Sequence, residues 1–224
     1  MIEIGPGALP LETFPALGAI AGVRHGFTGR VAGLDVKADR ALALERLDAS
    51  HAAARLALGL DNRAFITGEQ VHGREVAIVD AVTRSPVPLV DGLITADPRV
   101  CLGVYVADCF AVYLFDSRRR VAGLLHSGRR GSELGVAGVA IERMRADFGS
   151  DPADIVVQLS PCIRPPNYEV DFAAMIVAQC REAGVGEVVD CGVCTATHLD
   201  RYYSYRAEKG KTGRMLAFLA LDSA

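Results

Sequence analysis

Three residues far apart in the sequence form a ligand set that could hold a catalytic metal ion. His72 and His126 each lie beside glycines in turn-like segments, a setting that is unusual for a core histidine. Cys109 directly follows the charged Asp108 between two apolar runs. Two histidines and one cysteine match the protein ligands of a catalytic zinc whose fourth position is left to water. No local spacing links the three residues, so a core cysteine with two surface histidines also fits these residue types.

Arginines beside glycine-containing turns indicate anion binding near one of these histidines. His126 ends a predicted apolar strand, and the turn that follows carries Arg129 and Arg130. Sites in α/β sheets gather at strand ends, and free backbone N–H groups with nearby arginines suit an anion such as phosphate. Arg30 lies in a second glycine-flanked loop and could clamp a phosphate or a carboxylate in the same way. A solvated basic loop is the alternative interpretation.

The other cysteines and histidines are expected to have structural roles. Cys191 and Cys194 form a CxxC pair followed by His198, but no second pair completes a structural zinc site. The sequence contains six cysteines and lacks the basic N-terminal segment of a secretion signal, so reduced core thiols are expected. We expect His51 on the surface of a helix and His25 at the end of a strand.

The segments around these residues predict a layered α/β fold. Composition and apolar spacing predict helices over 39–60, 134–148 and 172–183. Short apolar segments predict strands over 74–79, 92–95, 100–106, 110–115, 121–125, 155–159 and 215–221. The order of these elements predicts a single layered α/β domain over residues 1–224, with a mixed sheet and flanking helices.

Composition favours a globular protein that acts on small molecules. The chain has 224 residues, a net charge of −3 and 50% hydrophobic residues, without the basic surplus typical of nucleic-acid or membrane-surface binding. A core of this size is stable without a structural metal, so a bound metal would serve chemistry. The longest uncharged stretch, Thr13 to Val23, is far shorter than a membrane span. We therefore expect a cytoplasmic protein without nucleic-acid or membrane partners.

Motifs along most of the chain carry a family resemblance. They are Gln70-Val71-His72-Gly73, Ala107-Asp108-Cys109, His126-Ser127-Gly128-Arg129-Arg130-Gly131, Pro161-Cys162-Ile163 with Tyr168-Glu169-Val170, and Tyr203-Ser204-Tyr205-Arg206 with Thr212-Gly213-Arg214-Met215. In this order they resemble the laccase-domain family, labelled multicopper polyphenol oxidase and also described as zinc-dependent purine nucleoside phosphorylases. The chain departs from the family where Arg129 replaces a Trp, and where Arg30 to Asp35 replaces the pattern Arg-x-Gly-Gly-x-Ser.

The resemblance implies both a fold and an activity. It implies a single α/β domain, similar to toxin deamidase domains, in which His72, Cys109 and His126 bind one zinc ion. It also implies phosphorolysis of adenosine, inosine and methylthioadenosine, with adenosine deamination as a companion activity. Purine nucleosides and phosphate are therefore the expected partners.

Four further residues are assigned expected roles in this activity. Arg30 and Arg130 are expected to neutralise phosphate, and Gln70 to donate or accept a hydrogen bond with the substrate. Asp108 is the candidate general acid or base. In a regular strand, however, its side chain would point to the face opposite that of Cys109.

Two other activities fit parts of the sequence. One cysteine and two histidines can also bind copper, but the four methionines lie outside the ligand motifs and five histidines are too few for a trinuclear cluster. Copper oxidation is therefore disfavoured. Cys109 as nucleophile with His126 as its base would instead give a cysteine hydrolase or deamidase, which needs no zinc. A non-enzymatic binding module would tolerate Cys109→Ala.

Overall fold

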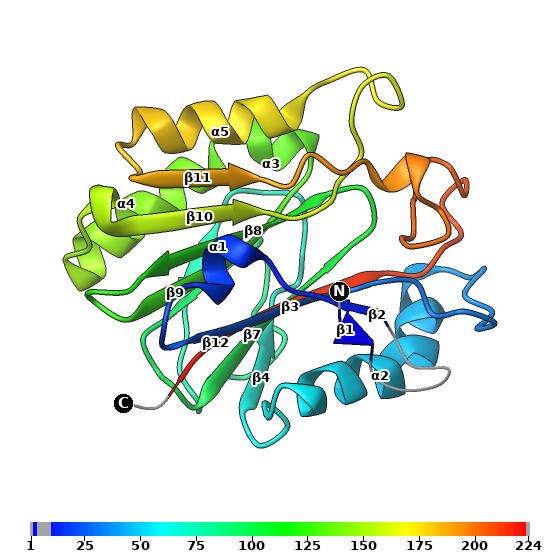
Figure 1. Ribbon diagram of the computed structural model, residues 1–224, viewed down its shortest axis with the longest axis horizontal. Helices are drawn as coiled ribbons and strands as arrows, with labels where there is room; N and C mark the ends of the chain where they lie inside the picture. Colours follow the sequence, from blue (N-terminus) through cyan, green and yellow to red (C-terminus); the bar gives the residue numbers. More distant parts are fainter. Residues whose placement is uncertain (1, 4–9, 223–224) are drawn as a thin grey trace.

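Two six-stranded mixed sheets form the centre of the protein in a computed structural model that describes residues 2–3 and 10–222 (Figure 1). The first sheet has the order β1 (Ile2–Glu3), β2 (Pro10–Glu12), β3 (Val23–Thr28), β12 (Met215–Leu221), β7 (Val100–Val106), β4 (Ala64–Thr67). The second has the order β11 (Glu187–Asp190), β10 (Ile155–Leu159), β8 (Phe110–Asp116), β9 (Val121–Ser127), β6 (Gly92–Thr95), β5 (Val76–Ile78). Only the pairs β4–β7, β5–β6 and β10–β11 are parallel among the described strands. Each sheet is thus antiparallel at its centre.

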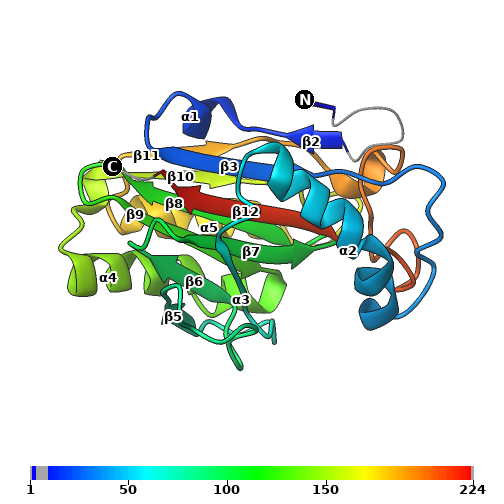
Figure 2. The same cartoon turned by 90° about the horizontal axis from the view of Figure 1, so that it is seen from below.

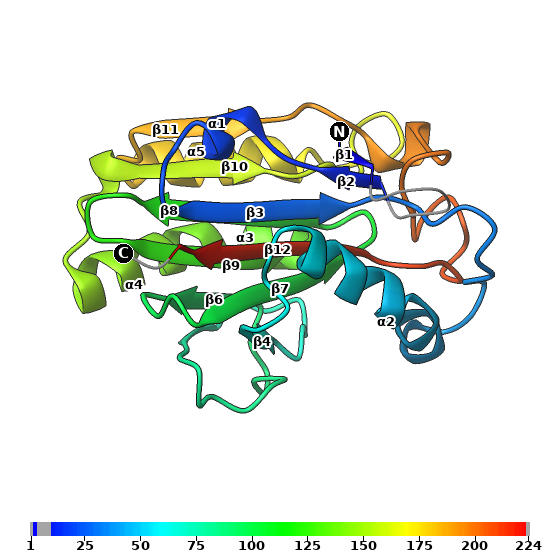
Figure 3. The same cartoon turned by 60° about the horizontal axis from the view of Figure 1, so that its bottom comes forward.

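Apolar residues on both faces of the central strands explain why the two sheets are covered on each side. In β9, Leu124 packs in the core between the sheets, whereas its neighbour Leu125 packs against helices. The outer face of the first sheet is covered by α2 (Arg40–Ala57), and that of the second by α4 (Val136–Phe148) and α5 (Phe172–Glu182). The order of layers is therefore helix, sheet, sheet, helices (Figures 2 and 3).

Most of the predicted elements are confirmed. Four strands, β6, β7, β10 and β12, have the predicted bounds, and β8 and β9 extend slightly beyond them. The first predicted helix forms as α2, which begins after Asp39 because the Asp39 carboxylate accepts the N–H of Leu42 at 3.0 Å. The predicted mixed α/β fold is confirmed, with two mixed sheets rather than one.

The second predicted helix begins two residues later than expected, at Val136 in place of Leu134. The short α3 (Arg129–Glu133) precedes it, and α4 begins only after Gly135, which has a φ of +79°. Such a φ is easy for glycine and interrupts a right-handed helix. Leu134, predicted to begin the apolar stripe, follows α3 and is 40% exposed.

Several short elements were not predicted from the sequence. They are β1, β2, β4, β11, α1 (Pro15–Gly18), α3 and the 3₁₀ turns Pro152–Asp154 and Thr195–Thr197. In β3, His25 lies within the strand and not at its end, because Gly26 and Thr28 continue the pairing with β12 and β2. No helix in the described part of the chain is long and apolar enough to cross a membrane.

Candidate metal centre and substrate pocket

The β8–β9 hairpin places Cys109 and His126 on the same face of the second sheet. His126 lies opposite Ala111 in the ladder, and Cys109 comes just before the first residue of β8. Because side chains alternate along a strand, the cysteine and the histidine project to the same side. Gly128 makes room for the thiol: a Cβ atom at this position would lie 2.7 Å from the Cys109 Sγ and 3.4 Å from the His72 Cδ2.

Asp91 connects the third ligand candidate to the hairpin. Its carboxylate accepts the backbone N–H groups of Val71, His72 and Gly73 at 3.2, 2.9 and 2.6 Å, and thereby holds the loop between β4 and β5. It also lies 2.7 Å from His126 Nδ1, so that Nε2 is the ring nitrogen left free. His72 itself has a left-handed φ of +59°, a conformation that non-glycine residues need outside support to keep.

The structure brings His72, Cys109 and His126 together as the sequence predicts. One ligand atom from each lies within 4.8 Å of the others, and the two imidazole rings meet edge to face at 4.8 Å. Within residues 10–222, no other group of three or more His, Cys, Asp or Glu side chains has this geometry. The three side chains could therefore hold a metal ion.

The charges at this cluster favour a thiolate. Burial would raise the pKa of the Cys109 thiol, but the charges and hydrogen bonds of His126 and His72 outweigh it and lower that pKa. Burial would likewise lower the pKa of His126, yet Cys109 and Asp91 raise it. A thiolate is the form of cysteine that binds metals or acts as a nucleophile. A histidine that bonds a carboxylate through one nitrogen and offers the other is the usual arrangement at metal sites.

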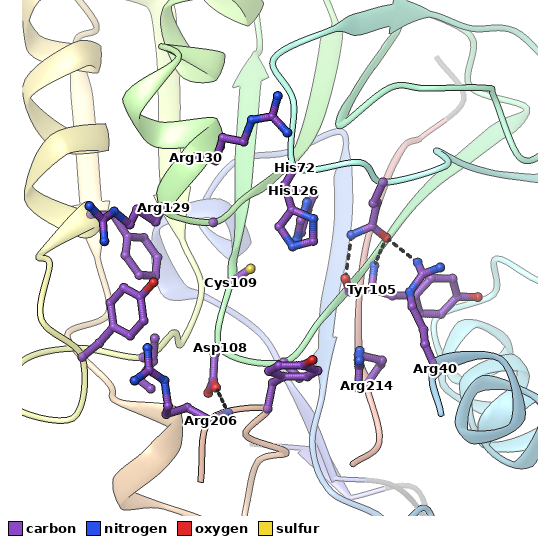
Figure 4. Close-up of a pocket in the computed structure, with 17 residues that line it drawn as sticks. Arg40, His72, Tyr105, Asp108, Cys109, His126, Arg129, Arg130, Arg206 and Arg214 are labelled. Carbon is purple, nitrogen blue, oxygen red and sulfur yellow. Dashed lines mark hydrogen bonds between the residues drawn. The ribbon is translucent and has the colours of Figure 1, made fainter. Parts of the chain in front are cut away.

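A pocket of about 540 Å³ opens above the cluster (Figure 4). Its lining includes the aromatic side chains Tyr105, Tyr168, Phe172 and Tyr205 and the cationic side chains Arg40, Arg129, Arg130, Arg206 and Arg214. Asp108 is the one carboxylate among its described lining residues. The pocket therefore combines surfaces for a flat ring with a strong positive charge.

Asp108 reaches this pocket through an unusual backbone conformation. It lies in the β7–β8 turn with a φ of +80°, so the strand alternation considered from the sequence does not apply. Its carboxylate accepts the Thr195 hydroxyl and the Arg206 N–H, both at 2.7 Å. Asp108 thus holds two loops at the pocket wall.

Of the three residues expected to bind substrate, two line the pocket. Arg130 lies there at the start of α3, and Gln70 donates to the Tyr105 carbonyl at 2.8 Å and accepts its N–H at 3.1 Å. Arg30 is not among the lining residues. Its guanidinium donates to the Tyr202 carbonyl and pairs with Glu208 at 2.7 Å, and so holds the segment that carries the pocket residues Tyr205 and Arg206.

The other histidines and cysteines lie outside the pocket. His51, predicted on the surface, lies on the buried face of α2, where its Nε2 donates to the Arg214 carbonyl at 3.1 Å. The His25 Nε2 accepts the Phe14 N–H at 2.7 Å in the core. The backbone around Cys194 pairs with Cys162, and His198 ends a 3₁₀ turn. None of these residues lines the described pocket.

Comparison with known proteins defines the class. The family model described as multi-copper polyphenol oxidoreductase laccase matches residues 24–174 and 170–222. The chain therefore belongs to this laccase-like family. It is 32% identical to a purine nucleoside phosphorylase of Streptomyces coelicolor, over 91% of this chain and 97% of that protein. It is also 32% identical to a purine nucleoside phosphorylase of Deinococcus radiodurans, over 96% and 94% of the two chains.

The structural comparison agrees with the sequence comparison. The crystal structure of YlmD from Geobacillus stearothermophilus matches with a TM-score of 0.81 and 25% identity, covering 97% of this chain and all of that one. The predicted resemblance to the laccase-domain family is thereby confirmed.

Three residues of the site carry little signal in the sequence: Asp91 behind His126, and Arg40 and Arg214 in the pocket lining. Asp91 precedes the apolar strand β6, and a charged residue beside such a run is the one local signal that could have identified it. Arg40 begins a helix, and Arg214 is one residue of a longer motif, so neither carries a signal of its own. Their proximity depends on contacts between distant segments.

Proposed function

We propose that this protein is a zinc-dependent purine nucleoside phosphorylase that acts on adenosine, inosine and methylthioadenosine, with adenosine deaminase activity in the same site. The observation that carries the proposal is the His72–Cys109–His126 cluster at the base of a pocket lined with aromatic and cationic side chains. Relatives named purine nucleoside phosphorylase that cover nearly the whole chain support it. We further propose that residues 1–224 act as one domain.

His72, Cys109 and His126 would hold the zinc ion in this proposal. Their donor set fits the ion, because one thiolate and two imidazoles leave a fourth position open and Asp91 orients His126 from behind. When bound, zinc supplies a Lewis acid that lowers the pKa of water from 15.7 to about 7, as deamination requires, or helps to position phosphate.

The pocket residues would bind and orient the two substrates. Tyr168 and Phe172 meet edge to face, with ring centroids 5.7 Å apart, and offer an apolar wall for a purine. Arg130 would add positive charge beside the phosphate, and Gln70 would set the position of β7. Arg30 would act as a positioning residue through its contacts with Tyr202 and Glu208.

Asp108 stays our candidate acid or base, because it is the carboxylate that lines the pocket. The Thr195 hydroxyl and the Arg206 N–H each donate to one of its two oxygens and thereby orient the carboxylate. Asp108→Asn is therefore expected to affect both turnover and the position of these loops.

The direct test is to incubate zinc-quantified protein with adenosine or inosine, each with and without orthophosphate, and to separate the products. Phosphate-dependent release of free base is the expected result, and conversion of adenosine to inosine would establish deamination. A zinc-containing sample that leaves both nucleosides unchanged would contradict the substrate assignment while leaving the metal site in place.

A cysteine hydrolase is the second candidate, and the Cys109–His126–Asp91 sequence of contacts favours it. Here Asp91 would orient His126 as the base for a Cys109 nucleophile. Metal content separates the two candidates, because a zinc-bound thiolate is not free to attack. Hydrolysis by zinc-free protein that is inhibited by added zinc would favour the hydrolase.

A further inference from the structure

The cationic side chains of the pocket fall into two groups that differ in their counter-ions. Arg129 pairs with Glu133 at 2.8 Å and lies 3.7 Å from Glu169, and Arg206 lies 3.4 Å from the same Glu169. Arg40 and Arg214 have no such partner: across residues 10–222, no carboxylate oxygen lies within 4.0 Å of either guanidinium. One group is therefore neutralised within the protein, and the other is not.

Arg214 is the more unusual member of the second group because it is buried. It is 9% exposed and directly precedes the first residue of β12. Its Nη1 donates to the carbonyls of Thr212 and Gly213 at 2.8 and 2.9 Å. No partner for its Nε or Nη2 is found within the described part of the chain. These hydrogen bonds fix the guanidinium at the pocket wall while leaving donors unused.

Arg40 adds a second positive charge at the same wall. It is the first residue of α2 and donates to Gln70 Oε1 at 3.3 Å (Figure 4). Burial lowers the pKa of Arg214, and the positive charge of Arg40 lowers it further. The negative charges of Cys109 and Asp108 act on Arg214 in the opposite sense, but its pKa is still lowered. An anion between the two arginines would therefore be stabilising.

Arg130 differs from this pair because it is exposed to solvent. It also lines the pocket without an acidic partner among the described residues, but it is exposed at the start of α3. Water can solvate an exposed guanidinium, so Arg130 needs no counter-ion. Arg214 is 9% exposed, so water in the pocket reaches its unpaired donors far less than bulk water reaches Arg130.

We propose that Arg40 and Arg214 form the subsite that binds the phosphate co-substrate. This inference rests on the proposed phosphorylase function. Paired guanidinium groups match the oxygens of a phosphate dianion, and the same chemistry would suit the 5′-phosphate of a nucleotide. The subsite lies across the pocket from the charge-balanced side that holds Arg129 and Arg206 (Figure 4), so phosphate and nucleoside occupy different walls.

The test compares Arg40→Gln, Arg214→Gln and the conservative Arg214→Lys with the wild-type enzyme. With inosine saturating, the phosphate KM is expected to rise roughly 10- to 100-fold in the two Gln variants, as expected for loss of a hydrogen bond to a charged group. The inosine KM is expected to change less than twofold. Arg214→Lys, which keeps the charge, is expected to fall between wild type and Arg214→Gln, a pattern that a merely structural role would not give.

The matched control is Arg46→Gln, which removes the same charge from the same helix. Arg46 pairs with Asp35 at 2.9 Å and does not line the pocket, so its variant is expected to keep the wild-type phosphate KM. An unchanged phosphate KM in active Arg40→Gln and Arg214→Gln would overturn the subsite without affecting the proposed function. An increase confined to Arg130→Gln would overturn it as well.

Calorimetry with orthophosphate alone separates the subsite from the reaction. If wild-type protein fails to cleave nucleosides, the proposed function fails, and the subsite stands only if orthophosphate binds the wild type and not the two Gln variants. Absent or unaltered orthophosphate binding would overturn it. The same titration with a nucleoside 5′-monophosphate identifies the source: dependence on the arginine pair for the nucleotide but not for orthophosphate would contradict the assignment.

Discussion

Histidines are buried in two regions of the molecule, and their pKa values are shifted in opposite directions there. In the core, burial lowers the pKa of His25 and of His51 to about 4, and both rings are neutral. At the base of the pocket, His126 is buried to a similar degree, yet Cys109 and Asp91 raise its pKa. Burial alone thus removes charge, whereas a buried ligand cluster keeps it through its partners.

The cysteines show the same contrast. Burial raises the pKa of Cys101 to about 12, and it also raises the pKa of Cys162 and Cys180. In the described chain, Cys109 is the one cysteine whose pKa is lowered, because two histidines face it. The comparison separates residues that fill the core from residues arranged for chemistry.

Removing a ligand should have the largest effect. Cys109→Ala, His72→Ala and His126→Ala are each expected to lose the metal and reduce turnover to background, while the fold remains, since two extended apolar cores do not depend on the ion. Elemental analysis measures the metal content, and circular dichroism tests whether the fold is retained. Full zinc occupancy in all three variants would disprove the ligand set.

Asp91→Asn should weaken the metal site without removing a ligand. The carboxylate orients His126 and holds the His72 loop through three backbone N–H groups, so zinc affinity is expected to fall about 10- to 100-fold. Competition with a chromophoric chelator measures this affinity. Asp80→Asn, at an exposed loop, is the control, and equal zinc affinities of the two variants would argue against the role of Asp91.

Gly128→Ala tests whether the close approach of the thiol matters. The new methyl group would lie 2.7 Å from Cys109 Sγ, so the thiol must move, at a cost of about 1–3 kcal/mol for overpacking. We expect a smaller loss of zinc affinity than in Asp91→Asn. Gly138→Ala, where a Cβ meets nothing within 4 Å, should leave zinc binding unchanged. Equal zinc affinities in the two variants would show that the site accommodates a methyl group at position 128 without displacing the thiol.

The core histidines should make the protein less stable in acid. Because the pKa of His25 is lowered from 6.5 to about 4, the unfolded chain takes up its proton first as pH falls. Stability is therefore lost between about pH 6.5 and 4, by roughly 3 kcal/mol for this residue. Urea unfolding of metal-free protein over this range measures how steeply the free energy of unfolding falls with pH. The His25→Gln variant is expected to show a smaller fall. An identical slope in the variant would contradict this explanation.

Local patterns predicted the elements whose residues share one environment. The strands β6, β7, β10 and β12 are continuous apolar runs buried on both faces, so their bounds follow from composition. In contrast, β11 (Glu187–Asp190) lies at a sheet edge with an exposed charge at each end and two half-buried valines between them, which gives little signal. The break before α4 depends on the backbone of Gly135, which the spacing of apolar residues does not encode.

Some residues of the candidate site could likewise be predicted from local sequence patterns, and others could not. His72, Cys109 and His126 stood out because their residue types are rare and their neighbours are turn-like. Asp91, Arg40 and Arg214 have common residue types, and their importance arises from contacts with segments distant in sequence. The glycine neighbours of Arg30 favour anion binding, but its guanidinium pairs with Glu208 and does not line the pocket.

The most direct test of the central claim is to measure inosine phosphorolysis as zinc is removed and returned. We expect one zinc per chain, loss of hypoxanthine release after chelation, recovery with added zinc, and a requirement for orthophosphate throughout. Undiminished turnover by protein that contains no zinc would contradict it.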